Sequence, residues 1–431
     1  MSVNGMTIEQ ASAFLSAVVA QMEGGALANV TPGNFTSVAQ NALLNSSYDP
    51  LSTAISQVIG RTIFSIRPYN GKLKFLWKDE QKFGGMLRKI NYLDGTLEND
   101  QGLYYSGTTA YTNGQVPTPD QYAIRKPATW QSNFYAWEQY QRVTTRFLDQ
   151  LDMSLRGPDE FGQFIAGQMQ NISDQLEEVN DAKARQCLIN FIGGKIRLDT
   201  TDVISSVKQA THVVHLLTEY NAQTGSSLTA ANYVAPANYK PFIEWLFARV
   251  ATLADMMSER GHNFNFSPKI GATAQTAAKA WIKRHTPKNR LKAVFIASEF
   301  NRIQSMAISE VFNKEELRMI DFEPINYWQS AKDPMNIIAS VAVNDATAAI
   351  VGPSTTDLET ASITTKGASS NPDKPVLGVL YDDDALGLSV VSEGVYTTPM
   401  HITGKYWNTA WHFNTRVLND FTENGVVLML D

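Results

Sequence analysis

The chain has little of what disulfide-stabilised, metal-binding and membrane proteins depend on. Its 431 residues include one cysteine, Cys187, and six histidines, which excludes an intrachain disulfide and leaves no Cys/His metal cluster around that cysteine. No run approaches the roughly 18 apolar residues of a membrane helix. Met1–Gly5 lacks the basic start and apolar core of a signal peptide. We therefore expect folding in a reducing cytoplasm and no membrane partner.

The motifs of common enzyme classes are missing as well. The chain contains no phosphate-binding loop, dinucleotide-binding fingerprint, zincin motif or nucleophile elbow. Lys and Arg number 36 against 42 Asp and Glu, giving a net charge of -6. A protein that neutralises phosphates is normally basic, so any contact with nucleic acid should be weak and non-specific. These absences favour a protein without catalysis and without a cofactor.

The N-terminal segment is expected to form two short helices, over 7–23 and 35–47. Thr7 can cap the first helix. Apolar residues then recur every three or four positions, including Ile8, Leu15 and Val18. This apolar face is too small to bury itself. We therefore expect Ile8, Leu15 and Val18 to contact another surface, belonging to a neighbouring copy of the chain.

The next segment reads as strands that lead into a long arm. Residues 62–66 and 73–77 have strand patterns, and the stretch 84–125 is rich in Gly, Tyr, Thr and Asn. Loops of this length are uncommon in compact domains unless they bind something. We expect a β-hairpin arm lying on a neighbouring copy, with aromatic anchors at Tyr104, Tyr105, Tyr111 and Trp130.

A long helix over 158–192 is the strongest expectation from periodicity. Pro158 suits the first turn, acidic residues follow it, and an apolar stripe continues to the pair Gly193-Gly194, which is expected to end the helix. A second helix is expected over 239–260, entered through Pro241. Short strands then alternate with helices, one of them over 298–312, around a Ser/Thr/Gly/Pro-rich surface insert at 344–375, and the tail after it is rich in strands.

Three features could carry chemistry, and each has a plainer interpretation. His212 and His215 would share a helical face as metal ligands do, but no third ligand is near, so packed or solvent-facing histidines are favoured. Asp382-Asp383-Asp384 could bind a hard cation, yet neighbours on a strand point to opposite faces, so an acidic turn is favoured. Cys187 lies on the apolar stripe and is expected to be a buried thiol rather than a nucleophile.

Three stretches carry a resemblance to a known family. They are the strand–turn–strand pattern from Ile59 to Ile90, the segment Arg146-Phe147-Leu148-Asp149 before the long helix, and the closing run from Tyr406-Trp407-Asn408 through Trp411-His412-Phe413 to Gly425-Val426-Val427-Leu428. With these stretches and the order of its elements, the chain resembles the major capsid proteins of tailed bacteriophages, which share the Johnson fold with herpesvirus capsid proteins. The likeness is closest to the small podophages that infect Bacillus.

The resemblance implies an α+β fold with five parts along the chain. They are an N-terminal arm (1–58), a β-hairpin arm or E-loop with its flanking strands (59–145), a peripheral domain (146–294) with spine helix 158–192, an axial domain (295–385) with the insert 344–375, and C-terminal strands that return to the peripheral domain (386–431). In this family the parts interlock between subunits, which agrees with arms that lack a core of their own.

The function that the resemblance implies is structural. The chain would self-assemble into hexamers and pentamers of an icosahedral head around double-stranded DNA, with scaffolding, portal and decoration proteins as further partners. It would be assembled in the host cytoplasm and reside in the virion capsid. Two alternatives stay open: an encapsulin-type shell protein, and a metal-dependent enzyme that uses Asp382–Asp384 with His401 or His412.

Overall fold

The structure is a computed structural model, and it describes most of the chain in separate stretches. The described residues are 8–22, 30–46, 54–55, 73–78, 87–92, 129–134, 137–154, 157–204, 207–267, 269–270, 278–279, 281–299, 301, 321–344, 358–365 and 374–431. They contain both helices and β-sheets, one of which is mixed, so the α+β class expected from the sequence is confirmed.

The chain forms two compact units, each assembled from segments that are distant in sequence. Unit 1 comprises 1–85, 135–188 and 386–418, and unit 2 comprises 86–134, 189–385 and 419–431. The five-part division that the family resemblance implies stays a prediction.

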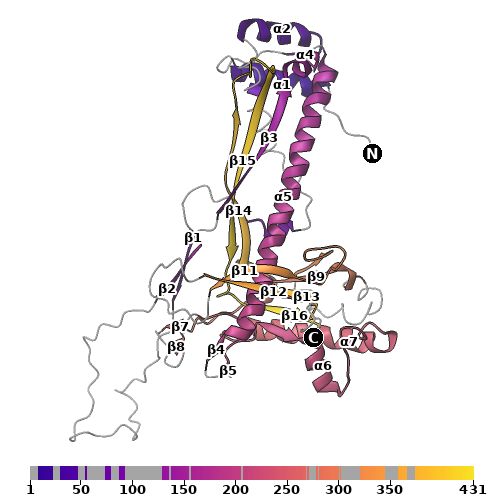
Figure 1. The fold of residues 1–431 in the computed structure, drawn as a ribbon, viewed down its shortest axis with the longest axis vertical. Helices are drawn as coiled ribbons and strands as arrows, with labels where there is room; N and C mark the ends of the chain where they lie inside the picture. Colours follow the sequence, from indigo (N-terminus) through magenta and orange to yellow (C-terminus); the bar gives the residue numbers. More distant parts are fainter. Residues whose placement is uncertain are drawn as a thin grey trace, which may run out of the picture. The chain divides into compact units, whose positions relative to one another are not determined.

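Unit 1 contains the N-terminal helices, a three-stranded sheet and the first part of a long helix (Figure 1). Its elements are α1 (Ile8–Met22), α2 (Phe35–Ser46), the 3-10 turn η1 (Lys74–Leu76), β3 (Trp137–Phe147), α4 (Leu148–Ser154), α5 (Pro158–Thr201) as far as Leu188, β14 (Leu386–Thr397) and β15 (Tyr406–Asn419) as far as Leu418. The expected helices over 7–23 and 35–47 are confirmed. Residues 73–77 were expected as a strand, but they form η1 followed by an isolated bridge at Trp77, so that expectation is wrong.

The sheet of unit 1 has the order β14–β15–β3 and is antiparallel where β15 meets β3. Along β15 the side chains alternate between buried and half-buried from Tyr406 to Thr415, as period-two geometry requires. The buried face presents Trp407, Trp411 and Phe413 to α1, α2 and the start of α5, and these elements share one apolar core. An arm expected to need a neighbour is therefore covered by its own unit.

Helix α5 extends beyond its expected end. It begins at Pro158, continues through Gly193-Gly194 and ends at Thr201, so the expected stop at the glycine pair is wrong. Its 44 residues correspond to about 66 Å at 1.5 Å per residue. Gly194 lies directly under the Phe421 ring, and a Cβ at this position would overlap that ring. Close packing thus explains a glycine that the sequence alone presents as a helix terminus.

Unit 2 is built on a mixed five-stranded sheet of order β10–β9–β13–β16–β6. The other described strands of unit 2 form separate two-stranded pairs. All strands of unit 2, in the order of the chain, are β1 (Leu87–Tyr92), β2 (Thr129–Phe134), β4 (Val203–Ile204), β5 (Val207–Lys208), β6 (Val213–His215), β7 (Lys269–Ile270), β8 (Ala278–Lys279), β9 (Leu291–Ile296), β10 (Asp321–Ile325), β11 (Ile338–Asn344), β12 (Leu358–Thr364), β13 (Val376–Asp382) and β16 (Gly425–Met429). Its helical elements are the end of α5, α6 (Leu216–Thr224), α7 (Pro236–Ser258), and the 3-10 turns η2 (Lys288–Arg290) and η3 (Asp383–Ala385).

The central strands of this sheet are buried on both faces. Every residue of β13 and β16 is buried, as expected for strands in the middle of a sheet. Helix α7 packs its apolar stripe, including Phe242, Leu246 and Val250, into the same core. It begins at Pro236 rather than at Pro241, because Ala235 is extended and Pro236 occupies the first turn.

Two further expectations are corrected or fall outside the described residues. The insert 344–375 is not simply a surface loop, because β12 lies within it and pairs antiparallel with β11. The expected helix over 298–312 is described only at 298, 299 and 301, which are helical. Among the described helices, none has the length and apolar character required to cross a membrane.

Candidate functional site

The segment 93–128, which was expected to belong to a hairpin arm, is flanked by a short antiparallel pair of strands. Leu87 of β1 lies opposite Phe134 of β2, and Tyr92 lies opposite Thr129. The antiparallel pairing expected for this arm is therefore present at its base. Of the expected anchors, Trp130 lies on β2 opposite Asn91, whereas Tyr104, Tyr105 and Tyr111 lie outside the described residues.

A buried turn between β15 and β16 holds the first strand of this pair. Asp420 and Glu423 are buried, and Lys89 of β1 pairs with both, its Nζ lying 2.6 Å from Asp420 Oδ2. Burial acts to lower the pKa of Lys89, but the two carboxylates outweigh it and the pKa lies above its usual value. The pKa of Glu423 also lies above its usual value, because burial raises it more than Lys89 and Arg284 lower it.

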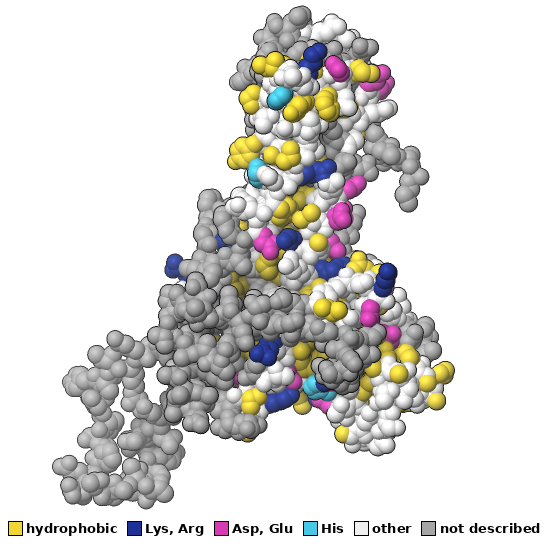
Figure 2. All heavy atoms as spheres, in the orientation of Figure 1, with side chains coloured by type: hydrophobic (Ala, Val, Ile, Leu, Met, Phe, Trp, Pro, Cys, Tyr) yellow, Lys and Arg dark blue, Asp and Glu magenta, His cyan; other side chains and the backbone are white. Residues whose placement is uncertain are grey.

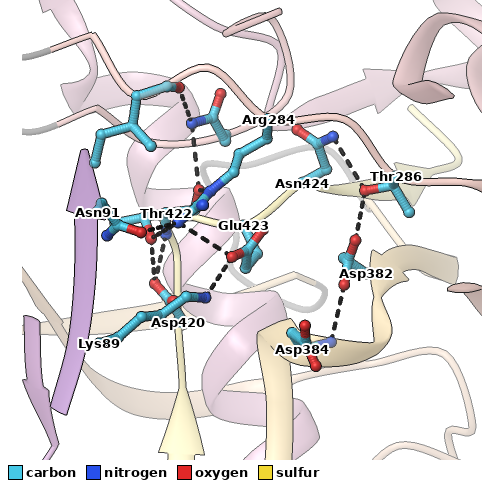
Figure 3. A network of polar contacts seen from close by, with 12 residues as sticks. Lys89, Asn91, Arg284, Thr286, Asp382, Asp384, Asp420, Thr422, Glu423 and Asn424 are labelled. Carbon is cyan, nitrogen blue, oxygen red and sulfur yellow. Dashed lines mark hydrogen bonds and ion pairs between the residues drawn. The ribbon is translucent and has the colours of Figure 1, made fainter. Parts of the chain in front are cut away.

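Arg284 makes the second connection to the same strand (Figure 3). Its Nη2 donates to Asn91 Oδ1 at 2.6 Å and lies 3.1 Å from Glu423 Oε1, and its Nε donates to the Thr422 carbonyl at 3.1 Å. Lys89 and Asn91 stand two apart on β1 and so face the same side. The strand is thus fixed at two successive positions of one face. We call Lys89, Asn91, Arg284, Asp420, Thr422 and Glu423 the root network.

The network continues to the acidic triplet singled out in the sequence. Asn424 Nδ2 donates to Thr286 Oγ1 at 3.1 Å, and that hydroxyl donates to Asp382 Oδ2 at 2.7 Å. Asp382 Oδ1 accepts the backbone N–H of Asp384 at 2.9 Å, and Asp384 pairs with Arg290. The triplet therefore forms a hydrogen-bonded turn after β13. Within the described stretches, no group of three His, Cys, Asp or Glu residues could hold a metal ion.

Lys195 of α5 lies behind the same turn with no exposed surface. Its Nζ donates to the carbonyls of Phe264 at 3.2 Å and Glu423 at 3.4 Å, and it lies 5.5 Å from the centre of the Phe191 ring. Burial lowers its pKa to about 7, although Asp420, Asp202 and Glu423 act in the opposite direction. The end of α5 is therefore joined to the turn that carries Asp420 and Glu423.

His212 and His215 do not share a helical face, and His212 is a packed histidine, as the favoured interpretation has it. Val213–His215 form β6, and His212 precedes it. His212 is fully buried, its Nε2 lies 3.0 Å from Asp202 Oδ2, and burial lowers its pKa to about 4. His215 lies between Asp199 at 3.6 Å and Asp431 at 2.5 Å, and hydrogen bonds to these carboxylates raise its pKa to about 9. One histidine is held neutral and the other charged.

His215 predicts a specific dependence of stability on alkaline pH. Its pKa is about 9 in the folded chain against 6.5 when unperturbed, so its stabilisation is complete below pH 6.5 and is lost as pH rises through 9. Lys208 pairs with Asp199 and Lys374 with Asp431, which leaves both carboxylates partly neutralised without His215. Allowing for solvent screening, we expect unit 2 to lose about 1–2 kcal/mol over this range.

Denaturant titrations at several pH values measure this loss. His215→Gln is expected to remove the slope, and His285→Gln, at an exposed position of the same unit, is expected to keep it. An unchanged slope in His215→Gln would show that other groups cause the alkaline loss.

Other residues considered for chemistry have local structural contacts. Cys187 Sγ lies 3.6 Å from the Leu418 carbonyl, and burial raises its pKa to about 12, as expected for an unreactive thiol. The His401 ring stacks on Tyr406 with centroids 4.9 Å apart, and His412 contacts Tyr396 edge-on at 5.4 Å. Both histidines belong to unit 1 and Asp382–Asp384 belong to unit 2.

The residues of α1 expected to meet a neighbouring copy are placed differently. Leu15 and Val18 have no exposed surface and belong to the apolar core of unit 1. That burial leaves no surface of these two side chains for a neighbour. Ile8 is the first residue of α1, and its side chain lies outside what the structure describes.

The root network was missed in the sequence for a physical reason. Lys89 and Asp420 are separated by 331 positions, and neither belongs to a local motif. The one local signal was Asp420-Phe-Thr-Glu-Asn-Gly425, a polar turn between two strand patterns, which is indistinguishable from an exposed turn.

Comparisons with known proteins give matches to solved structures alone. No protein-family model matches the chain, and no curated protein matches its sequence. Among solved structures, the chain is similar to one from the capsid of Staphylococcus phage Andhra, with 10% identity, a TM-score of 0.46 and coverage of 85% of this chain and 84% of the phage chain.

Two further solved structures are similar to the chain at equally low sequence identity. A chain from the structure of the head fiber and inner core protein gp22 of native bacteriophage P68 shows 8% identity and a TM-score of 0.47, covering 84% of this chain and 85% of that one. A chain from the capsid of Myoviridae phage XM1 shows 9% identity and a TM-score of 0.38, covering 82% and 88%. At these scores, the function has to be argued from this chain's own elements.

Proposed function

We propose that the protein is a structural, non-enzymatic major capsid protein of a tailed phage. The observation that carries the proposal is the order of its elements. The antiparallel pair β1 and β2 precedes a 44-residue helix (α5), and a mixed five-stranded sheet follows. The late strand β15 then returns to pair with β3, and β14 pairs with β15. This order agrees with the hairpin arm, spine helix, axial domain and returning strands that the family resemblance implies.

The physics of the root network supports an arm that works outside its own unit. Ion pairs to buried carboxylates are costly to form unless their geometry is good, and one use of such pairs is to fix a single arrangement. Here they fix both β1 positions that face the turn, Lys89 and Asn91, while residues 93–128 continue beyond the pair. A base that is fixed at two positions suits an arm that must reach a defined place on another subunit.

The finer parts of the proposal follow from the resemblance. The subunits would form hexamers and pentamers of an icosahedral head, closest in kind to the small Bacillus podophages, and assemble in the host cytoplasm with scaffolding, portal and decoration proteins. A net charge of -6 supports weak, non-specific contact with the packaged double-stranded DNA.

Negative-stain electron microscopy of the purified protein tests the proposal, alone and co-produced with a scaffold-like protein from the same gene cluster. Shells, tubes or capsomer rings are expected in at least one condition. Monomers or dimers in both conditions would contradict a capsid function.

A further inference from the structure

One segment of the chain carries charge of a single sign. Residues 260–298 contain eight Lys or Arg residues and no Asp or Glu, in a chain whose overall net charge is -6. Figure 2 shows a different pattern along the described part of unit 1, where Lys and Arg side chains are interspersed with Asp and Glu. A local excess of positive charge in an acidic chain indicates a partner with negative charge.

Two stretches of this segment pair as a short ribbon. The Gly261 N–H donates to the Arg284 carbonyl at 2.8 Å, and the Arg284 N–H donates to the Gly261 carbonyl at 2.7 Å. The Arg284 side chain points to Glu423 within unit 2 (Figure 3). Because successive side chains of an extended strand point to opposite sides, Lys283 and His285 point away from that interior.

The outward side of the ribbon is basic and aromatic. Arg260, Trp281, Lys283 and His285 are exposed, and the residues between Trp281 and His285 alternate with them as buried or half-buried positions. The half-buried His262 ring packs against the Trp281 ring, with the two centroids 4.1 Å apart. We call Arg260, His262, Trp281, Lys283 and His285 the basic face.

The basic residues that follow the ribbon have acidic partners in unit 2. Lys288 lies 2.6 Å from Asp255, and Arg290 lies 2.5 Å from Asp384. These two cations therefore add little to the net charge of the surface. The positive charge of the basic face comes from Arg260 and Lys283, so each subunit can supply only a few ionic contacts. Weak binding is what a container wall requires, since it must not hold its contents tightly.

Duplex DNA fits the basic face better than an acidic protein surface does. Protein interfaces combine an apolar centre with charges of both signs in a fixed arrangement. The basic face has cations, imidazole rings and one indole ring, and the exposed amide of Asn263 lies next to it in sequence. Arg, Lys and Asn side chains are common donors to DNA phosphates. Phosphates recur along the whole duplex, so such a face can meet them in any register.

We propose that the basic face contacts the phosphate backbone of the packaged double-stranded DNA. This inference rests on the proposed function and names the surface that makes the weak contact. Arg260 and Lys283 each pair with a phosphate, and the Asn263 amide donates to a neighbouring phosphate oxygen. Many subunits then hold the outermost DNA near the wall, because weak contacts add when they act together.

Binding of the full-length free chain to a fluorescently labelled DNA duplex, over a series of salt concentrations, tests the proposal. The double variant Arg260→Gln/Lys283→Gln is expected to bind about tenfold more weakly at low salt. Its slope of log affinity against log salt should be smaller by about 1.8, because each phosphate contact contributes about 0.9. Thermal melting verifies that the variant is folded.

The matched control is the double variant Lys240→Gln/Lys332→Gln, which removes two exposed cations elsewhere in unit 2. It is expected to keep the affinity and the slope of the unaltered chain. Equal behaviour of the two double variants would overturn the proposal, and so would an unaltered chain that does not bind the duplex at low salt.

Formaldehyde treatment of DNA-filled particles locates the contact in the assembled shell. Peptides that contain Lys283 are expected to be linked to DNA, as mass spectrometry can detect. A carbodiimide cross-link from Lys283 to a carboxylate of a second chain in empty shells would identify an acidic protein partner and overturn the proposal.

Two outcomes separate this inference from the capsid function. Filled particles without a DNA link at Lys283 would overturn the inference while the capsid function stands. A chain that never forms shells, yet binds the duplex through the basic face, would contradict the capsid function and retain the DNA-binding surface.

Discussion

Deletion of residues 100–118 is expected to leave a soluble, folded subunit that no longer forms shells. The deletion removes residues of the segment between β1 and β2 and retains both strands, since β1, β2 and the root network lie outside it. Contacts by long arms add many weak interactions into one stable lattice, so their loss should abolish assembly rather than weaken it slightly. Electron microscopy and sedimentation of the purified variant measure the result.

A replacement variant separates the reach of the arm from its chemistry. Exchanging residues 100–118 for a Gly/Ser segment of equal length keeps the reach but removes Tyr104, Tyr105 and Tyr111. We expect this variant to fail in assembly as the deletion does, because a flexible segment loses more conformational entropy and gains no aromatic contacts. Complete particles from the deletion variant would show that this segment has no part in assembly.

Substitution of Lys89 by Met is expected to destabilise the free subunit by about 2–4 kcal/mol, because it leaves two buried carboxylates with one fewer cation. Asp420 keeps its bonds from the Thr422 N–H and hydroxyl, and Glu423 keeps Arg284, which limits the loss. The free energy of unfolding from denaturant titration measures it. Hydrogen exchange should locate the largest loss of protection in β1 and β2.

Lys240→Met is the matched control for this experiment. Lys240 lies on α7 with its side chain 67% exposed, 3.9 Å from Glu244, and such surface pairs contribute little. The double variant Lys89→Met/Asp420→Asn should recover part of the loss, since it also removes the buried negative charge that Lys89 neutralises. Equal effects of Lys89→Met and Lys240→Met would mean that the root network does not hold the arm.

The root network also links the stability of the free subunit to the assembly of particles. If Lys89→Met loosens the root while the subunit stays folded, fewer and less regular particles should form, because each arm must then find its place on a neighbour from a wider range of directions. Free subunits with normal stability and normal assembly would argue that the arm is positioned by its neighbours alone.

Local and periodic signals explain which elements could be predicted. The helix over 158–192 was visible because proline, acidic residues and an apolar stripe agree along contiguous sequence, and the same holds for α1 and for β13, β15 and β16. The end of α5 was not visible. Gly193-Gly194 resembles a helix stop, and only the folded chain shows the Phe421 ring, more than two hundred positions away, packed against Gly194.

By itself, the sequence indicated which classes of protein to exclude and predicted the α+β class. It also predicted the order of arm, long helix and late strands, and it shows the uncharged run between residues 101 and 119. Only the tertiary structure decided that Leu15 and Val18 are covered by their own unit, that Asp382 supports a turn, and that Lys89 and Arg284 meet Asp420 and Glu423. It also paired Glu138 of β3 with Lys183 of α5 and buried Arg146 of β3 over Trp411. The reason is physical: periodicity follows from neighbouring residues, whereas burial, ion pairing and the choice of an exposed face depend on which distant segments pack together.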